Sequence, residues 1–454
     1  MRTEALTAFK RCCDAVSPYT CVKQALRLTS EKLTIYSPSG SVAVDVSSRT
    51  RFIITAFGKA SIAMATAAEE QLGGRLHEGI VIAPNVAGAK AVPNLRSRVF
   101  HGARNNLPDS DSVAATHEAL KSIERNDSSD SIFLFLVSGG GSALFCAPDG
   151  ISLEEKLLTI RTLAANGADI RVLNSFRQKL SAVKGGKTLN YVKKGQVVAL
   201  LMSDLIDNLI QFIASGPTIP QTGSMVEMSK ALTSSPKWTS LLPARILNKL
   251  QDPAPSSVKP HNIIVGSIST ALSALKEYLT NQGYDAHIIT STLEGNATQR
   301  GKDFAELIMS PRKGLLTALE KFSGSVKGEL GEKVALLFGG ETTVVVRGSG
   351  KGGRCQEMTL SCLATLASSA KPLPSFLFLA AGTDGQDGPT DAAGAYITNI
   401  DVKRDIVTQA TEYLETSNSY QFWSSYNNGQ NHIKPGPTGT NVMDIQIVLM
   451  DFVH

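Results

Sequence analysis

Short apolar runs of strand length alternate with helical patterns along this chain, and this alternation most restricts what it can fold into. The apolar run 52–57, for example, precedes an Ala-rich helical pattern at 61–72. Continuous apolar runs are typical of parallel strands, because helices cover both faces of their sheet. The pattern continues with strands predicted at 79–83, 132–137 and 196–202 and helices at 109–124, 152–164 and 171–184. It predicts parallel βαβ units and an α/β fold.

The amino-acid composition changes between about residues 221 and 260, where Ser, Thr and Pro become frequent. Residues 252–260 are predicted to form a linker. A chain of 454 residues is long enough for two domains, and we place them at 1–255 and 256–454. The Gly-Gly-Glu after 334–338 predicts a β-hairpin with 342–347. The second half also predicts strands at 262–266, 286–290, 376–380 and 445–452 and helices at 269–282, 298–308 and 355–367.

Charge and apolar runs exclude several classes of protein. The formal net charge is +5, and no run of five basic residues occurs, so no nucleic-acid partner is expected. No apolar stretch approaches the roughly 18–20 residues of a membrane span, so no membrane partner is expected. The first 16 residues predict an amphipathic helix rather than a signal peptide, which favours a cytoplasmic protein and leaves a mitochondrial presequence open. Six cysteines without a C-x-x-C pair predict reduced, buried thiols.

Glycines that directly follow a predicted strand are the strongest functional signal. The run Ser138-Gly139-Gly140-Gly141-Ser142 comes after 132–137 and turns back toward helix. Consecutive glycines let backbone N–H groups converge on one anion, and the serine hydroxyls add donors. The alternative is a sharp turn that needs glycine only for its dihedral angles. Three glycines between two serines favour anion binding.

A second glycine-rich loop, 348–354, connects 342–347 to the helix predicted at 355–367. Gly350, Lys351, Gly352 and Gly353 lie just before a helix N-terminus, where anions are favoured, and Arg354 can bind a phosphate through two N–H groups. A mobile surface loop is the competing interpretation. Neither loop is a Walker A motif, and no G-x-G-x-x-G opens a helix with a suitably spaced acidic residue.

Lys59 and a set of aspartates complete the candidate chemistry. Lys59 follows 52–57, and the carboxyl end of a parallel strand faces the crevice where ligands bind, although a solvated turn lysine is equally consistent with the position. Asp384, Asp387 and Asp391 lie in one glycine-spaced loop, and Asp204 ends another predicted strand. Such carboxylates can bind Mg²⁺, or they can cap helices and turns. Phosphoryl transfer needs cationic groups and a metal ion to neutralise charge and backbone donors to hold the phosphates. The candidate cations, metal-binding aspartates and glycine-rich loops together meet these needs.

The ordered set of motifs resembles the class II glycerate kinases, the family with a C-terminal MOFRL domain. The resemblance spans essentially the whole chain. The matching runs are 57–60 (FGKA), 137–144 (VSGGGSAL), 180–186 (LSAVKGG), 203–204 (SD), 214–218 (ASGPT), 338–342 (FGGET), 350–357 (GKGGRCQE), 381–391 and 439–444 (GTNVMD).

This resemblance implies ATP- and Mg²⁺-dependent phosphorylation of D-glycerate, with the 2-hydroxyl favoured over the 3-hydroxyl. It implies a Rossmann-like parallel-sheet N-terminal domain, a smaller mixed-sheet α/β C-terminal (MOFRL) domain, and an active site in the interdomain cleft; a return of the last strand to the N-terminal domain is left open. Lys59 and Arg354 match the proposed catalytic pair. The implied phosphate and substrate contacts are Ser138, Gly139, Gly140, Gly141, Ser142, Lys184, Gly350, Lys351, Gly352 and Gly353, and the implied metal ligands are Asp204, Asp384 and Asp387.

Three departures from the family pattern bear on activity. Residues 207–211 replace a Gly-Asp-Pro-Leu-Asp-like stretch, and Cys355 and Met443 each stand where the family has Asn. Two other functions stay open, a nicotinamide-dependent hydroxypyruvate reductase and a non-catalytic module that senses anions. The expected partners are small molecules, and a monomer and a homodimer are both compatible with the sequence.

Overall fold

The computed structural model describes residues 1–85, 95–206, 209–250, 256–322, 326 and 328–453. The chain forms two compact units, each described by itself. The parallel-sheet unit comprises Pro18–Ser203 and Asn208–Val265, and the mixed-sheet unit comprises Met1–Ser17, Asp204–Asp207 and Gly266–His454. The domain boundary at 255/256 and the cleft predicted from the sequence stay predictions.

The parallel-sheet unit is built on a six-stranded sheet with the order β6-β5-β4-β7-β8-β9. The pairs from β6 through β8 are parallel, which confirms the Rossmann-like prediction. Every residue of β7 is buried, as its continuous apolar sequence predicts. The strands are β4 (Arg51–Phe57), β5 (Leu76–Pro84), β6 (Arg98–Gly102), β7 (Ser131–Val137), β8 (Gln196–Met202) and β9 (His261–Gly266).

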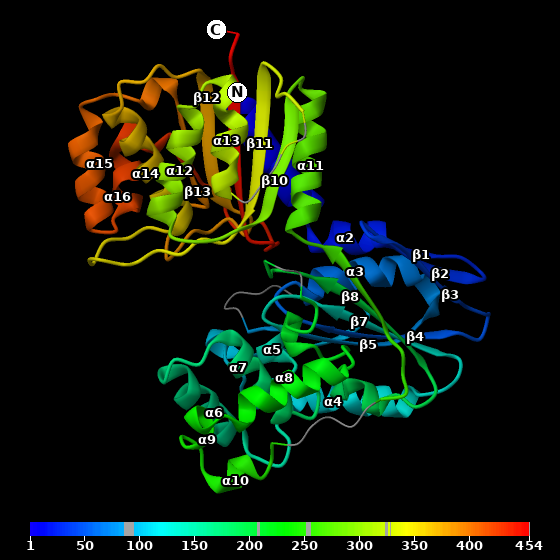
Figure 1. The fold of residues 1–454 in the computed structure, drawn as a ribbon. Coiled ribbons are helices and arrows are strands. Elements are labelled where there is room, and N and C mark those ends of the chain that lie inside the picture. Colours follow the sequence, from blue (N-terminus) through cyan, green and yellow to red (C-terminus); the bar gives the residue numbers. More distant parts are fainter. Residues whose placement is uncertain (86–94, 207–208, 251–255, 323–325, 327, 454) are drawn as a thin grey trace. The chain divides into compact units, whose positions relative to one another are not determined.

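Helices cover both faces of this sheet. In Figure 1, α3 (Ser61–Leu72) lies on one face and α4 (Ser110–Asn126) on the other. A small antiparallel sheet, which the sequence analysis did not predict, precedes β4 and consists of β1 (Leu26–Leu28), β2 (Lys32–Ser37) and β3 (Gly40–Asp45). The other helices of the unit are α2 (Pro18–Ala25), α5 (Gly141–Leu144), α6 (Leu153–Ala165), α7 (Ile170–Lys179), α8 (Gly223–Ser234), α9 (Pro236–Thr239) and α10 (Ala244–Leu247).

The mixed-sheet unit has the strand order β10-β11-β15-β12-β13-β14. Only β10 and β11 pair in parallel; the other pairs are antiparallel. The last strand, β15, lies between β11 and β12, so it completes this sheet. The strands are β10 (Asp285–Leu293), β11 (Lys333–Gly340), β12 (Ser375–Gly382), β13 (Gly394–Thr398), β14 (His432–Ile433) and β15 (Asp444–Asp451).

Two groups of helices sandwich the mixed sheet (Figure 1). The first pair, α1 (Arg2–Ala15) and α11 (Ile268–Asn281), packs together against one face. The opposite face carries a core that contains Leu336, Phe338 and Phe378 and residues of α12 (Ala297–Ile308) and α14 (Arg354–Ser368). The short α13 (Leu315–Leu319) and the helices α15 (Ile406–Glu415) and α16 (Ser419–Ser425) complete the unit.

Two details differ from the sequence-based predictions. The predicted hairpin between 334–338 and 342–347 is wrong, because β10 and β15 already pair with both edges of β11. After β11 the chain instead reaches Thr343, whose N–H donates to the Gly295 carbonyl at 2.9 Å. The helix predicted at 171–184 ends at Lys179, so Lys184 lies in a turn whose next two residues, Gly185 and Gly186, have positive φ angles of 61° and 79°.

The other predicted helices and strands are confirmed within a few residues. The predicted linker 252–260 falls partly on residues 251–255, which lie outside the described residues. Within the part of the chain that the structure describes, no helix combines the length and apolar character needed to cross a bilayer.

Candidate functional site

Lys59 lies in the loop after β4, where it is bonded to the loop after the neighbouring strand β7. Its N–H donates to the Gly139 carbonyl at 2.9 Å, and the N–H of Ala60 donates to Ser138 Oγ at 3.0 Å. The Ser138 N–H in turn donates to the Phe57 carbonyl at 3.2 Å. Parallel pairing of β4 and β7 therefore brings two sequence motifs, 57–60 and 137–144, to one edge of the sheet.

Two glycines allow this close approach. Gly58 has φ +123°, and a Cβ there would lie 2.2 Å from Ser138 Oγ. Gly140 has φ +78°, and the aliphatic part of the Lys59 side chain passes 3.1 Å from the place of its missing Cβ. The Lys59 side chain is exposed and has no hydrogen-bond or ion-pair partner among the described residues. Its ammonium group is thus available to an anionic ligand.

Lys184 is buried, and its ammonium group hydrogen-bonds to backbone carbonyls at the glycine loop and does not face solvent. Its side chain is 1% exposed, and Nζ donates to the carbonyls of Ser142 at 2.8 Å and Phe145 at 3.1 Å. Burial, together with the positive charge of Lys156, lowers the pKa of Lys184 to about 7. The Ser142 hydroxyl is hydrogen-bonded to the Ser215 hydroxyl at 2.9 Å.

Arg354 begins α14 in the mixed-sheet unit, where two carboxylates hold its guanidinium. Nε and Nη2 donate to the two oxygens of Asp444 at 2.5 and 2.8 Å, and Nη1 lies 3.1 Å from Oε1 of Glu341. Two of the five guanidinium N–H groups thus donate to Asp444, and Nη1 forms an ion pair with Glu341. The N–H groups that do not bond to Asp444 can donate to a phosphate oxygen.

Asp444 and Glu341 were not predicted as site residues from the sequence. Both lie in motifs that carry the family resemblance, 439–444 and 338–342, so position in a matching motif was the available signal. Asp444 comes from β15 and Glu341 follows β11, and these strands are neighbours in the sheet. Sheet pairing therefore brings the two carboxylates together from positions distant in sequence.

The acidic side chains and the guanidinium shift the pKa values of Arg354 and Glu341. Burial lowers the pKa of Arg354, but the hydrogen bond and charge of Asp444 outweigh this and raise it above its ordinary value. Burial raises the pKa of Glu341, the charge of Arg354 opposes that effect, and the charges of Asp444, Asp204 and Asp384 add to it. Arg354 thus lies among several acidic side chains and stays protonated.

The second glycine-rich loop packs tightly against the segment between α15 and α16. A Cβ on Gly350 would lie 2.6 Å from the Thr416 carbonyl oxygen, and one on Gly352 would lie 2.1 Å from Ser419 Oγ. The Lys351 N–H donates to Asn418 Oδ1 at 3.1 Å. These contacts explain the glycines by packing, and phosphate binding by Gly350, Lys351, Gly352 and Gly353 stays a prediction.

Asp387, predicted as a metal ligand, caps the start of α14. Oδ1 accepts from the N–H of Cys355 at 3.2 Å, and Oδ2 accepts from the N–H and Nε2 of Gln356 at 2.9 and 3.0 Å. Burial and the charge of Asp444 raise the pKa of Asp387 to about 7. Both oxygens are therefore committed to the protein, and a protein carboxylate occupies the N–H groups where a phosphate was expected.

The other two predicted metal ligands are less buried than Asp387. Asp204 and Asp384 are both half-buried, and Asp384 Oδ1 accepts from the Gln386 N–H at 3.0 Å. No set of three or more His, Cys, Asp or Glu residues within the described ranges forms a metal-binding cluster.

The structure describes the surroundings of two of the departures from the family pattern, and it explains the one at Cys355. Cys355 is fully buried and contributes to the core between α12, α14 and the sheet. Met443 is 2% exposed and has φ +74°, a conformation that Asn adopts more readily than Met. Of the third departure, residues 207–208 lie outside the described part of the chain.

Comparisons with known proteins address the chain as a whole. Residues 4–251 match the family described as a domain of unknown function, DUF4147, and residues 334–444 match the MOFRL family. The two matched regions together cover both halves of the chain.

Named relatives and a solved structure agree with this assignment. A Rattus norvegicus glycerate kinase is 34% identical over 87% of this chain and 84% of its own length. A Thermotoga maritima D-glycerate 2-kinase is 33% identical over 88% of this chain and 91% of its own. The crystal structure of glycerate kinase from Thermotoga maritima superposes with a TM-score of 0.79 at 29% identity, covering 99% of both chains. The chain belongs to the class II, MOFRL-domain family of glycerate kinases.

Proposed function

We propose that this protein transfers the γ-phosphoryl group of ATP to D-glycerate and that the 2-hydroxyl is the acceptor. The observation that carries the proposal is the exposed Lys59 ammonium beside the 138–142 loop, which has no partner among the described residues, in a chain that aligns over most of its length with a D-glycerate 2-kinase. In the reaction, the glycerate oxygen forms a bond to the γ-phosphorus, the bond from that phosphorus to the β–γ bridging oxygen breaks, and ADP leaves. The hydroxyl proton passes to solvent or to a nearby carboxylate.

Lys59 and Arg354 have complementary roles in this proposal. The Lys59 side chain is flexible and can follow the charge on the γ-phosphoryl oxygens as it develops. Arg354 is fixed by Asp444 and Glu341, so its remaining N–H groups keep one orientation and cost little entropy on binding phosphate. The N–H groups and hydroxyls of 138–142 are the proposed donors to the remaining phosphoryl oxygens.

Mg²⁺ enters this scheme as a component of the ATP substrate. In kinase sites Mg²⁺ commonly keeps several waters and needs only one or two protein carboxylates beside the phosphates, which fits a chain whose described residues form no complete metal cluster. Asp204 and Asp384 are the candidates for such contacts. Asp387 is not proposed, because both of its oxygens accept bonds from α14.

The test is product analysis by ³¹P NMR with the full chain, D-glycerate, ATP and Mg²⁺. We expect a phosphomonoester whose phosphorus is coupled to one carbinol proton, as 2-phosphoglycerate requires; coupling to two methylene protons identifies 3-phosphoglycerate and refutes the acceptor assignment. No product, or oxidation of NADH with hydroxypyruvate in its place, refutes the kinase.

Variants test the two cations separately. Lys59→Met should lower kcat by about a hundredfold or more, the range expected for a lost transition-state contact. Arg354→Lys keeps the charge but not the planar donor pattern and should lower kcat substantially while the chain stays folded. Lys121→Ala is the matched control: Lys121 is exposed on α4 and forms a surface ion pair with Glu118, so kcat should not change. A Lys59→Met enzyme with wild-type turnover contradicts the role of Lys59.

A further inference from the structure

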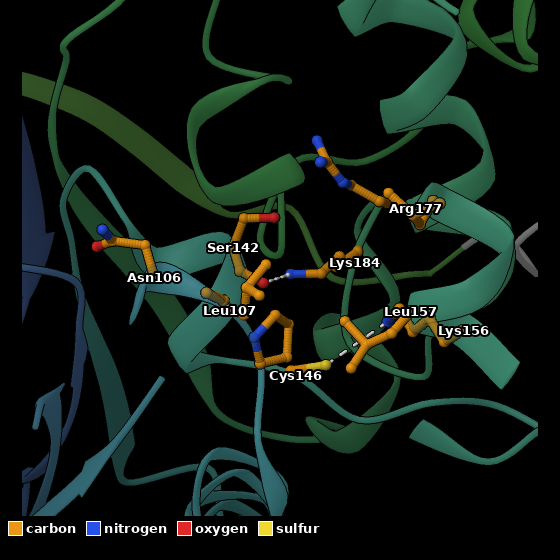
Figure 2. A pocket seen from close by; sticks show the side chains of 11 residues that line it. Asn106, Leu107, Ser142, Cys146, Lys156, Leu157, Arg177 and Lys184 are labelled. Carbon is orange, nitrogen blue, oxygen red and sulfur yellow. Dashed lines mark hydrogen bonds between the residues drawn. The ribbon is translucent and has the colours of Figure 1, made fainter. Parts of the chain in front are cut away.

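A small cavity lies in the parallel-sheet unit, directly beside the glycine loop. It has a volume of about 160 Å³. Its wall is formed by the loop after β6, by the start of α5, and by side chains of α6, α7 and the turn after α7 (Figure 2). The residues that matter for its chemistry are Ser142, Cys146, Lys156, Arg177 and Lys184.

The charged side chains that line this cavity are all positive. Lys156 is 3% exposed and Lys184 is 1% exposed, and Arg177 is half-buried. No aspartate and no glutamate is found among the described residues that line the cavity. Burial of a charge without an opposite charge is costly, so three cations around one small space create a strong preference for an anion inside it.

The partners that these cations have are neutral. Within the described part of the chain, the Cys146 thiol at 3.7 Å is the only hydrogen-bond partner of Lys156 Nζ, and Figure 2 shows this contact beside the one between Lys184 and the Ser142 carbonyl. Arg177 donates from Nη1 to Asn174 Oδ1 at 3.0 Å, and most of its N–H groups have no acceptor among the residues that the structure describes. Asp149 acts on Lys156 through space, but its side chain is 59% exposed and lies 4.0 Å from Lys187, outside the cavity wall.

The mutual repulsion of the cations supports the same conclusion. Burial and the neighbouring positive charges lower the pKa values of both Lys156 and Lys184. An anion at the centre would offset these effects. The apolar part of the wall, from Leu107, Leu157 and Ile160, suits a short carbon chain, and the volume is well below the roughly 300–1,000 Å³ of sites for larger ligands such as a nucleotide.

We propose that this cavity binds the carboxylate of the small hydroxy-acid substrate, with Arg177, Lys156 and Lys184 as the binding residues. This inference rests on the proposed function, because it places the acceptor of the phosphoryl group. Ser142 belongs both to the cavity wall and to the 138–142 loop, whose Gly139 carbonyl accepts the Lys59 N–H. An acid bound by its carboxylate in the cavity can therefore extend its hydroxyl end toward the loop that carries the proposed phosphoryl contacts.

Steady-state kinetics with three variants tests the assignment. Arg177→Gln and Lys156→Met should each raise KM for D-glycerate at least tenfold and change KM for ATP less than twofold. The matched control is Arg171→Gln, because Arg171 is an exposed arginine on the same helix, α7, and it should leave both KM values unchanged. Thermal unfolding checks that the variants are folded. Lys156→Met removes a buried charge, so its melting temperature should equal or exceed that of the wild type.

Calorimetric titration with D-glycerate and no nucleotide supplies a second readout. The wild type should bind D-glycerate and L-lactate but not glycerol, which lacks the carboxylate, and the Arg177→Gln variant should lose the binding. If the wild type is an active kinase but Arg177→Gln and Lys156→Met behave like Arg171→Gln, the cavity assignment is wrong and the proposed function stands. If the wild type does not phosphorylate D-glycerate but binds it in an Arg177-dependent way, the proposed function fails while the cavity remains a carboxylate site. Absence of both binding and turnover refutes both.

Discussion

Replacement of Asp444 by Asn should destabilise the mixed-sheet unit strongly, because it leaves Arg354 without its principal partner. Asp444 is fully buried and accepts two N–H bonds from Arg354 at 2.5 and 2.8 Å. The Asn side chain keeps one acceptor oxygen but turns an NH₂ group toward a guanidinium N–H. Arg354 then retains only the outer carboxylate, Glu341, for charge compensation.

The expected loss of unfolding free energy follows from the exposure of the Arg354, Asp444 and Glu341 side chains. Removal of one partner of a buried ion pair costs about 3–5 kcal/mol. The Arg354 side chain is 26% exposed and still contacts Glu341, so we expect the lower end, about 3 kcal/mol. Glu341 is 46% exposed, and Glu341→Gln should therefore cost only about 0.5–1 kcal/mol, as exposed pairs do.

The two tryptophans provide a selective assay. Trp238 belongs to the parallel-sheet unit, and Trp423 lies in the mixed-sheet unit, where its indole N–H donates to the Gln356 carbonyl at 3.0 Å. In a Trp238→Phe background, the fluorescence reports on Trp423 alone. With an m value of about 2–3 kcal/mol per M of urea, Asp444→Asn should lower the unfolding midpoint by about 1 M. A midpoint equal to that of the parent, or a larger shift for Glu341→Gln than for Asp444→Asn, refutes the reasoning.

Three further predictions concern single positions. Gly58→Ala should cost about 2 kcal/mol or more and lower kcat, because its Cβ would lie 2.2 Å from Ser138 Oγ at a positive φ; urea unfolding and turnover measure both, and a wild-type midpoint contradicts the steric argument. Asp387 holds its proton up to about pH 7 when folded but only to about 3.8 when unfolded, so its contribution to stability should decline as the pH rises through this window. Asp387→Asn should remove that decline, and equal pH dependence of the two unfolding midpoints refutes it. Lys184 loses its proton near pH 7 when folded and near 10.5 when unfolded, so wild-type stability should rise with pH between these values relative to Lys184→Met; a constant difference between the two proteins argues against a depressed pKa.

Most strands and helices could be predicted from the sequence because their signals are local. The run 132–137 is apolar at every position and forms the fully buried β7, and the pattern at 61–72 coincides with α3. The hairpin at 334–347 could not be judged in the same way. Whether 342–347 pairs with β11 depends on β10 and β15, which come from distant parts of the chain and occupy both of its edges.

The residues of the candidate site show the same difference between local sequence signals and long-range contacts. Lys59 and 138–142 were predicted because glycines follow strands in the sequence, and β4–β7 pairing brings them together. Lys156 and Arg177 lie on helices without any motif, and only the fold places them around one cavity. Asp387 shows the opposite case: its glycine-spaced loop favoured metal binding over helix capping, and the structure shows that its carboxylate accepts hydrogen bonds from the start of α14.

The position of β15 has a consequence for biosynthesis. This strand follows β11 and β12 in the chain, yet it lies between them in the sheet and carries the carboxylate that orients Arg354. Until it emerges, β11 and β12 have unpaired edges and the arginine has no buried counter-ion, so a nascent or prematurely terminated chain can complete the parallel-sheet unit but cannot assemble the mixed sheet. Deletion of β15 should therefore abolish function far more completely than deletion of the same length from a surface loop.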